Sequence, residues 1–308
     1  MDFILSFLNS IPGTFGQGLA WGIMAIGVYI TYRILDVADL TVDGTMATGG
    51  AVFAVLAVAG APIPLALLGA FFSGMAAGLV TGLFHTACGI PAILAGILTQ
   101  LALYSVNLRV MGSANMAVNG MQYDLLISSQ EVTSLSIRNP IFLVGVSVLV
   151  IIGALYWFFG TELGASLRAT GSNANMSRAQ GIDTNFTKVL GLMLSNGLVA
   201  LSSALLAQYQ GFADVNMGRG AIVIGLAAVI IGEVLLSRVF HNFALKLCAV
   251  AIGSILYYLV YQVVIWLGLN TNDMKLVTAL IVAVFLAIPH WKGHYLTRAT
   301  KKGGGTDA

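Results

Sequence analysis

Charged residues are scarce in this chain. Only 14 lysines and arginines and 12 aspartates and glutamates occur among 308 residues, so 8% of the sequence is charged, about a third of the usual share in soluble domains. No Asp, Glu, Lys or Arg occurs from Gly44 to Leu108. Hydrophobic residues make up 58% of the chain, and the mean hydropathy is +0.92. Because a water-soluble surface is built largely from charged and polar side chains, the sequence predicts a polytopic, all-α membrane protein.

Other absences exclude further classes. The net charge is only +2 and the basic residues are dispersed, so no basic patch favours nucleic acid as a partner. Cys88 and Cys248 stand alone in apolar surroundings and form no metal-binding spacing, which predicts two buried, inert thiols. Met1–Phe15 has no basic start and no small-residue cleavage site, so we expect no removable signal peptide. No Gly-Lys dipeptide occurs, so the chain has no nucleotide-binding loop, and we expect neither an enzyme activity nor a cofactor on it.

Membrane spans follow from the apolar windows. A helix needs about 20 apolar residues to cross the hydrocarbon core. The windows predict nine spans, at residues 15–33, 44–61, 64–84, 91–110, 139–160, 188–209, 220–236, 243–268 and 275–291. The segment before the first span is short and interrupted by Asn9, Ser10 and Pro12, which favours an interfacial helix over a tenth span.

The distribution of Lys and Arg sets the orientation. If the loop at 161–187 and the tail at 292–308 are cytoplasmic, ten basic residues lie inside and four outside, as the positive-inside rule requires. The N-terminus is then outside, and 111–138 is an external loop, which either docks a partner or caps the helix bundle.

An internal repeat divides the single domain, 1–308. Ala38–Gly44 and Ala213–Arg219 are similar acidic openings, each leading into a small-residue apolar segment. On the predicted topology these two segments run in opposite directions. We therefore expect an inverted repeat, with a first helical repeat at 15–110, a linker helix at 139–160 and a second repeat at 188–291.

The cytoplasmic loop has a specific pattern. Leu163–Ala169 and Ala174–Gln180 predict two short helices. Gly171 is expected to stop the first in a left-handed conformation, Asn173 to cap the second, and Gly181 to close it. Two helices held between membrane spans form a rigid knob, which is suited to passing motion to or from a cytoplasmic partner.

This loop resembles the coupling loop of ABC importer permeases. The resemblance rests on Leu167–Asn173 (LRATGSN) and Arg178–Ile182 (RAQGI), and it is to the group that includes branched-chain amino acid and ribose permeases. Arg33–Gly44, Pro91–Thr99 and Leu103–Gly112 look closest to a branch that pairs with binding proteins for tryptophan and tyrosine. By this resemblance, the residues that contact the ATPase are Glu162, Leu167, Arg168, Ala169, Gly171, Asn173, Arg178, Gly181 and Ile182.

The resemblance also implies partners. A separate cytoplasmic ATPase would bind ATP and Mg, an external binding protein or lipoprotein would deliver a small solute, and two permease copies would form a homodimer in the inner (cytoplasmic) membrane. One departure is that sugar permeases of the group often have a tenth span, which is not predicted here.

Polar residues at membrane depth are candidate pathway residues. If their segment is helical, Asp36, Asp39 and Asp43 share one face of it. Their segment either forms an ion pair with Arg33 or is a broken helix that lines a cavity. Asp214 and Asn216, at the matching position of the second repeat, have the same two interpretations, with Arg219 as the ion partner.

Three further polar residues, Gln100, Tyr104 and Asn107, fall on one side of the fourth span. Asn196 lies in the middle of the sixth. These side chains either form hydrogen bonds between helices or contact substrate. The tentative translocation pathway therefore consists of Asp39, Asp43, Gln100, Tyr104, Asn107, Asn196, Asp214 and Asn216.

Two other classes compete with an ABC permease for an aromatic amino acid. An ion-coupled secondary transporter of a small organic solute would need a carboxylate near the middle of a span, whereas the acids here cluster at span ends. A membrane-embedded protease would need a GxGD or GxSG motif, and neither Asp43-Gly44 nor Ser73-Gly74 lies in one.

Overall fold

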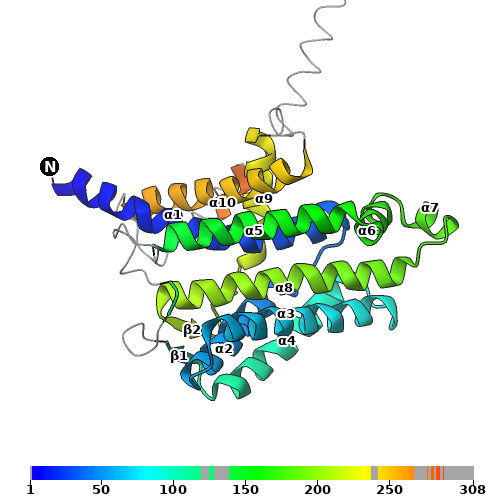
Figure 1. Ribbon diagram of the computed structural model, residues 1–308, viewed down its shortest axis with the longest axis horizontal. Helices are drawn as coiled ribbons and strands as arrows, with labels where there is room; N and C mark the ends of the chain where they lie inside the picture. The colour runs from blue at the N-terminus through cyan, green and yellow to red at the C-terminus, as the bar shows by residue number, and fades with distance from the viewer. Residues whose placement is uncertain are drawn as a thin grey trace, which may run out of the picture.

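The computed structural model describes residues 2–118, 125–127, 139–236 and 242–266, a few positions between 276 and 287, and side chains from Ser10 onward. The described chain is almost entirely helical (Figure 1). Its helices are α1 (Asp2–Tyr29), η1 (Ile30–Ile34), α2 (Val42–Val58), α3 (Ile63–Thr86), α4 (Ala92–Met111), α5 (Pro140–Gly160), α6 (Glu162–Ser172), α7 (Ala174–Ala179), α8 (Thr184–Gln210), α9 (Ala221–Leu236) and α10 (Phe243–Trp266). Two short strands, β1 (Asn115–Ala117) and β2 (Phe212–Asp214), pair antiparallel.

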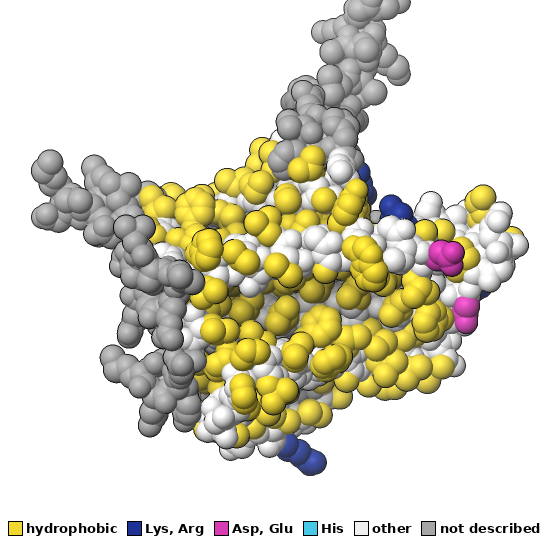
Figure 2. Space-filling model, in the orientation of Figure 1, with side chains coloured by type: hydrophobic (Ala, Val, Ile, Leu, Met, Phe, Trp, Pro, Cys, Tyr) yellow, Lys and Arg dark blue, Asp and Glu magenta, His cyan; other side chains and the backbone are white. Residues whose placement is uncertain are grey.

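The predicted all-α membrane fold is confirmed. Within the described residues, α3, α4, α5, α8 and α10 are long and apolar enough to cross a membrane, while α2 and α9 are apolar but have only 17 and 16 residues. Figure 2 shows hydrophobic side chains spread along the visible face, and charged ones mainly at the end that carries α6 and α7. The ninth predicted span and the tail lie almost wholly outside the described residues, so the number of spans stays a prediction.

The N-terminal segment corrects one expectation. It is not a separate interfacial helix, because α1 runs unbroken from Asp2 through the first predicted span and continues as the π-helix η1. Pro12 lies inside α1, and the Thr14 hydroxyl in the adjacent turn donates to the Ser10 carbonyl at 2.9 Å. A proline removes only one helical hydrogen bond, whereas ending the helix in apolar surroundings would leave several backbone groups unpaired.

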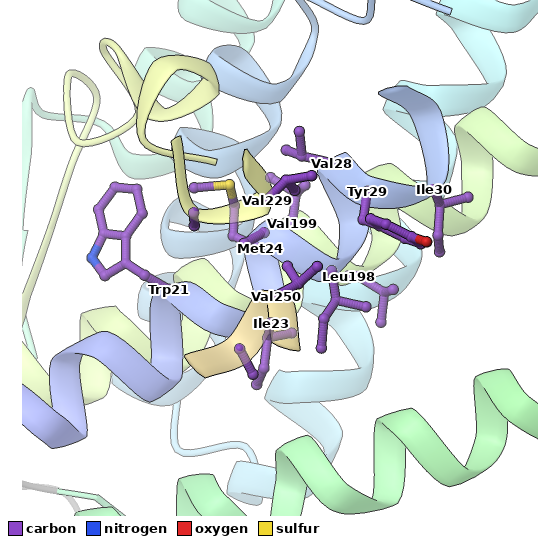
Figure 3. Packing of buried hydrophobic residues seen from close by; sticks show 14 of the residues in the cluster. Trp21, Ile23, Met24, Val28, Tyr29, Ile30, Leu198, Val199, Val229 and Val250 are labelled. Atoms are coloured by element: carbon purple, nitrogen blue, oxygen red, sulfur yellow. The ribbon is translucent and has the colours of Figure 1, made fainter. Parts of the chain in front are cut away.

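The packing agrees with the predicted inverted repeat. Helix α8, the first of the second repeat, packs on α2 and α3, and α1, the first of the first repeat, packs on α9 and α10. Helices α2 and α3 pack together, as do α9 and α10, and α1 packs on α8 between the two groups. Exchanging the two repeats therefore reproduces these contacts, whereas the linker helix α5 packs on α1 and α10 without matching contacts to α8 and α3 of the same extent. The buried side chains that join them come from α1, α8, α9 and α10 (Figure 3).

Small residues bring the helices close together. The backbone of α8 lies so near α3 that a Cβ on Gly74 or Gly78 would come within 2.3 Å of a carbonyl oxygen, at Asn196 or Leu192. Gly18 meets α10 in the same way, because its Cβ would lie 2.9 Å from the Ile255 Cα. These glycines therefore serve packing, as close helix association in lipid requires.

The cysteine prediction is wrong for Cys88. Cys88 is exposed in the turn after α3, and Cys248 on α10 is only partly buried. Both lie in apolar sequence, but a membrane protein also presents its apolar segments to lipid, so apolar neighbours do not predict burial inside the protein.

Candidate translocation cavity and coupling loop

The acidic opening before α2 is not helical. Residues 35–41 are irregular, and Asp36 takes a left-handed φ of 55°. Asp36, Asp39 and Asp43 therefore do not share a helical face, which corrects that prediction. The chain changes direction after η1, at Asp36. Asp39 then forms a local turn, in which its Oδ1 accepts the Thr41 backbone N–H at 2.9 Å. The segment thus has the broken-helix form that was the second interpretation.

Asp39 is buried and joined to α8. Its Oδ2 accepts a hydrogen bond of 2.7 Å from Asn196 Nδ2, and Asn196 Oδ1 accepts one of 2.7 Å from the Thr45 hydroxyl. Asn196 also donates to the Leu192 carbonyl, so all its polar atoms are paired. Buried polar groups cost little free energy when paired in this way. Of the two interpretations of Asn196, interhelical hydrogen bonding is therefore the one that the geometry supports.

Asp43 connects the two openings. Its carboxylate accepts the backbone N–H groups of Gly220 and Ile222, both at 2.9 Å. An acidic side chain at this position satisfies amides that would otherwise be unpaired and complements the positive end of the α9 dipole. The first turns of α2 and α9 therefore meet, as two half-helices of opposite direction do in inverted-repeat transporters.

A cavity of about 390 Å³ lies beside this junction. It is lined by Asp43, Gly44, Ala47, Gln100, Leu101, Tyr104, Asn107, Val215 and Arg219. Four predicted pathway residues, Asp43, Gln100, Tyr104 and Asn107, therefore come together from α2 and α4. Arg219, which enters from the segment before α9, was predicted only as an ion partner of Asp214.

Asn107 is the unusual member of the cavity. It is only 1% exposed, yet neither Oδ1 nor Nδ2 has a hydrogen-bond partner among the described residues. An unpaired buried amide costs about 1–3 kcal/mol, so it is a feature that folding alone does not favour. Tyr104, one turn earlier on α4, leaves 44% of its surface exposed. The cavity thus offers a free amide, an accessible ring and a guanidinium.

The remaining predicted pathway residues lie elsewhere. Asp214, at the end of β2, accepts the Asn216 backbone N–H at 2.6 Å and contacts the Asn115 side chain at 3.4 Å. Asn216 itself is exposed. Neither lines the cavity, and within the described part of the chain Asp214 forms no ion pair with Arg219. Asp214 shapes a turn here, as aspartates often do.

The expected Arg33–Asp36 ion pair is also wrong. Arg33 Nε instead contacts Glu233 Oε1 on α9 at 3.0 Å, while Asp36 is exposed. Local spacing does not predict a pair between Arg33 and a residue 200 positions away. The contact exists because the π-helical end of α1 and the end of α9 are adjacent.

The loop at 161–187 forms the two predicted helices, α6 and α7. Asn173 caps α7, and its side chain accepts the Met176 N–H at 3.0 Å. Gly181 ends the knob with a left-handed φ of 83°. Gly171 does not stop α6, because it lies inside that helix. Its lack of a side chain serves another purpose: a Cβ there would lie 1.8 Å from the Ile34 carbonyl oxygen.

The knob is held firmly at its base. Arg168 donates from Nη2 to the Phe159 carbonyl at the end of α5 at 2.8 Å, and Arg178 donates from Nε to the Thr184 hydroxyl at the start of α8 at 2.7 Å. Leu167 is fully buried. By contrast Glu162, Gly181 and Arg178 are exposed, and Ala169 and Ile182 are half-buried. Three large apolar side chains are also exposed, Leu163 and Met176 on the knob and Phe186 at the start of α8.

Comparison with known proteins shows the family of this chain. Residues 10–288 match the family model of the branched-chain amino acid transport system permease component. The chain belongs to this family. Its members are permease subunits of ABC importers and not ATPases themselves, so the chain is a multi-pass transport protein. The coupling-loop motif is therefore a correct indicator of the family.

Three individual relatives are similar to this chain over much of its length. A tyrosine transport system permease protein of Clostridioides difficile is 38% identical over 280 residues, covering 91% of each chain. An uncharacterised protein of Rickettsia prowazekii is 34% identical over 91% of this chain and 98% of its own. An autoinducer 2 import system permease of Salmonella paratyphi B is 26% identical over 69% of this chain and 59% of its own. The solved structure of PsaBC from Streptococcus pneumoniae has the same fold, with a TM-score of 0.53 at 16% identity over 92% of this chain and 94% of its own.

Proposed function

We propose that this permease passes an aromatic amino acid, such as tyrosine or tryptophan, across the inner membrane through a pathway that includes the cavity at Asn107. The cavity volume falls within the range that holds small ligands. Arg219 offers a cation to a carboxylate, Tyr104 offers a face for ring stacking, and Asn107 supplies both a donor and an acceptor. The relative named as a tyrosine transport permease supports the same substrate.

The unpaired amide of Asn107 carries this proposal. A transport pathway needs several weak contacts rather than one tight site, so that the solute also leaves. An amide that is paired only while a solute passes fits that requirement. Asp39 and Asn196, in contrast, are paired with one another and with Thr41 and Thr45, which gives them the role of fixing α2 against α8.

The pathway is completed by a second copy of the chain. The cavity opens on a face of α4 where Leu101 is 65% exposed beside Tyr104. A single copy lines this space with α2, α4 and the segment before α9. Two copies facing each other here would enclose the solute, in agreement with the homodimer that the family resemblance implies.

A separate cytoplasmic ATPase drives transport through the knob. Met176, at 62% exposure, and Leu163 and Phe186 are exposed apolar side chains on the knob and at the start of α8, while Arg168 and Arg178 hold the knob to α5 and α8. Apolar anchors surrounded by polar residues are typical of protein interfaces. A rigid knob transmits a displacement that a flexible loop would absorb. An external binding protein supplies the solute on the opposite side.

Uptake assays test the substrate. In a strain without other routes, cells that carry this permease with its partner subunits should accumulate tyrosine or tryptophan, and leucine or ribose should not compete. Tyr104→Ala should lower aromatic uptake by roughly tenfold and Tyr104→Phe should retain it, because stacking needs only the ring. Phe72→Ala, which removes an exposed aromatic from α3 outside the cavity (61% exposed, against 44% for Tyr104), is the control. Uptake of ribose but no aromatic amino acid would contradict the proposal.

A further inference from the structure

A second polar cavity lies at the opposite end of the molecule from β1 and β2, beside the base of the knob. Its volume is about 550 Å³. Three of its lining residues are basic: Arg33 from η1, Arg168 from α6 and Lys246 from α10. No aspartate or glutamate is among the described residues that line it. We call it the basic cavity.

The basic side chains retain hydrogen-bonding capacity. A guanidinium has five N–H donors, and the described contacts use one on Arg33, toward Glu233, and one on Arg168, toward the Phe159 carbonyl. Lys246 is exposed. The cavity also faces the first turn of α10, whose dipole favours an anion. Even with Glu233 neutralising Arg33, two cations remain without an acidic partner in the cavity.

The surroundings of the basic cavity change from polar to apolar along α5 and α10. An adjoining cavity shares Arg168 and Phe243 with it and adds Tyr156 and Trp157. Trp157 is 74% exposed. Tyrosine and tryptophan side chains are enriched at the boundary between lipid headgroups and hydrocarbon, so this boundary is expected at the end of α5.

Farther along the same two helices lies a large apolar groove. It has a volume of about 920 Å³ and is lined by Leu19 of α1, by α5 residues such as Gly145 and Ile152, and by α10 residues such as Cys248 and Ile252. Ile152 is one helical turn from Tyr156, so the groove continues along α5 toward the aromatic side chains, whereas Cys248 and Lys246, two residues apart, lie on opposite sides of α10. The aromatic side chains therefore connect the basic cavity, through the shared Arg168 and Phe243, to the apolar groove in the seam between α5 and α10.

We propose that this seam binds an anionic phospholipid of the cytoplasmic leaflet. Its phosphate headgroup would contact Arg168, Lys246 and Arg33, and an acyl chain would lie in the apolar groove. Basic pockets between transmembrane helices on the cytoplasmic side recognise anionic headgroups in this way. Because Arg168 also holds α6, a bound lipid would stabilise the knob against α5 and α10.

Lipid affinity of the purified full-length protein tests the headgroup contacts. By native mass spectrometry, phosphatidylglycerol should bind at least about fivefold more tightly than phosphatidylcholine, and Lys246→Gln should remove about fivefold of its affinity, the effect of one charge near a lipid headgroup. Lys188→Gln, which removes a cation from α8 outside the cavity, should change nothing. Equal affinity for the two lipids, or equal effects of the two variants, would overturn the proposal.

A second pair of variants tests the acyl-chain contact. A Cβ at Gly145 would meet only Leu19, at 4.0 Å, so Gly145→Leu should fold normally while filling the groove. It should weaken phosphatidylglycerol binding severalfold, whereas Gly153→Leu, also on α5 with open space but outside the groove, should not.

Two other ligands would give different results. If soluble glycerol phosphate binds as tightly as phosphatidylglycerol, the cavity holds a free anion and the lipid proposal is wrong. If Lys246→Gln loses the ATPase during co-purification but keeps its lipid affinity, the cavity belongs to the protein interface instead. That result would also contradict the proposal.

Discussion

Replacing Asn107 by leucine should stabilise the protein and impair its transport. Leucine has the same number and branching of side-chain heavy atoms as asparagine and needs no hydrogen bonds, and the adjoining cavity has room for its larger methyl groups. The native amide is buried with both polar atoms unpaired, which costs about 1–3 kcal/mol. Removing this penalty should raise the thermal midpoint by about 2–4 °C for each kcal/mol gained, the scale of a large domain.

Transport should change in the opposite direction. If the amide pairs with the passing solute, its loss removes one or two hydrogen bonds, and uptake at low substrate concentration should fall by roughly tenfold. Asn196→Leu is the matched control, because that amide is equally buried but fully paired with Asp39, Thr45 and the Leu192 carbonyl. It should lower the thermal midpoint, since it leaves the Asp39 carboxylate with one donor fewer.

The assays are thermal unfolding in detergent and radiolabelled uptake. A stabilised Asn107 variant with impaired transport, beside a destabilised Asn196 variant, is the expected pattern, in line with the usual conflict between stability and function at active positions. An Asn107→Leu protein that unfolds at a lower temperature, or one that transports like the wild type, would refute the reasoning.

Three other predictions concern the ends and the centre of the molecule. Asp43→Ala should destabilise the protein by about 1–2 kcal/mol, because it uncaps α9, and Asp43→Asn should cost less; thermal unfolding of both variants measures the difference. Gly171→Val should uncouple ATP hydrolysis from transport or release the ATPase, since its side chain would displace α6 from the Ile34 carbonyl; co-purification and ligand-stimulated hydrolysis decide, and wild-type values for both would mean that the knob is passive. In a cysteine-free background, Ser172→Cys should react only with reagents from the cytoplasm and Ser113→Cys only from outside; reaction of both from one side would reverse the topology.

Much of the architecture could be predicted from the sequence. Long apolar windows define helices because the backbone must be paired internally in lipid, so α3, α4, α5, α8 and α10 lie close to their predicted ranges. The knob was predictable because its signals are local: Asn173 is a good cap and Gly181 a good helix end. The grouping of Gln100, Tyr104 and Asn107 followed from helical periodicity alone.

The wrong predictions concern contacts between residues that lie far apart in the sequence, which local patterns do not show. Arg33 pairs with Glu233, and Asp43 with the first amides of α9, across about 200 and 180 residues of sequence, which no spacing rule reaches. Gly171 was assigned a turn because glycine favours left-handed backbone, whereas the structure needs it for close approach. The sequence does not predict that Asn107 is unpaired, because only the packing of α2 and α4 shows which amide lacks a partner.

The central claim is that this permease passes an aromatic amino acid with energy from a separate ATPase. The direct measurement is uptake of labelled tyrosine into vesicles that contain the permease, its ATPase and its binding protein. Uptake should require ATP on the side of the knob and continue when ionophores collapse the proton and sodium gradients. Uptake that proceeds without ATP and stops with the gradients would instead make the chain an ion-coupled transporter and contradict the account.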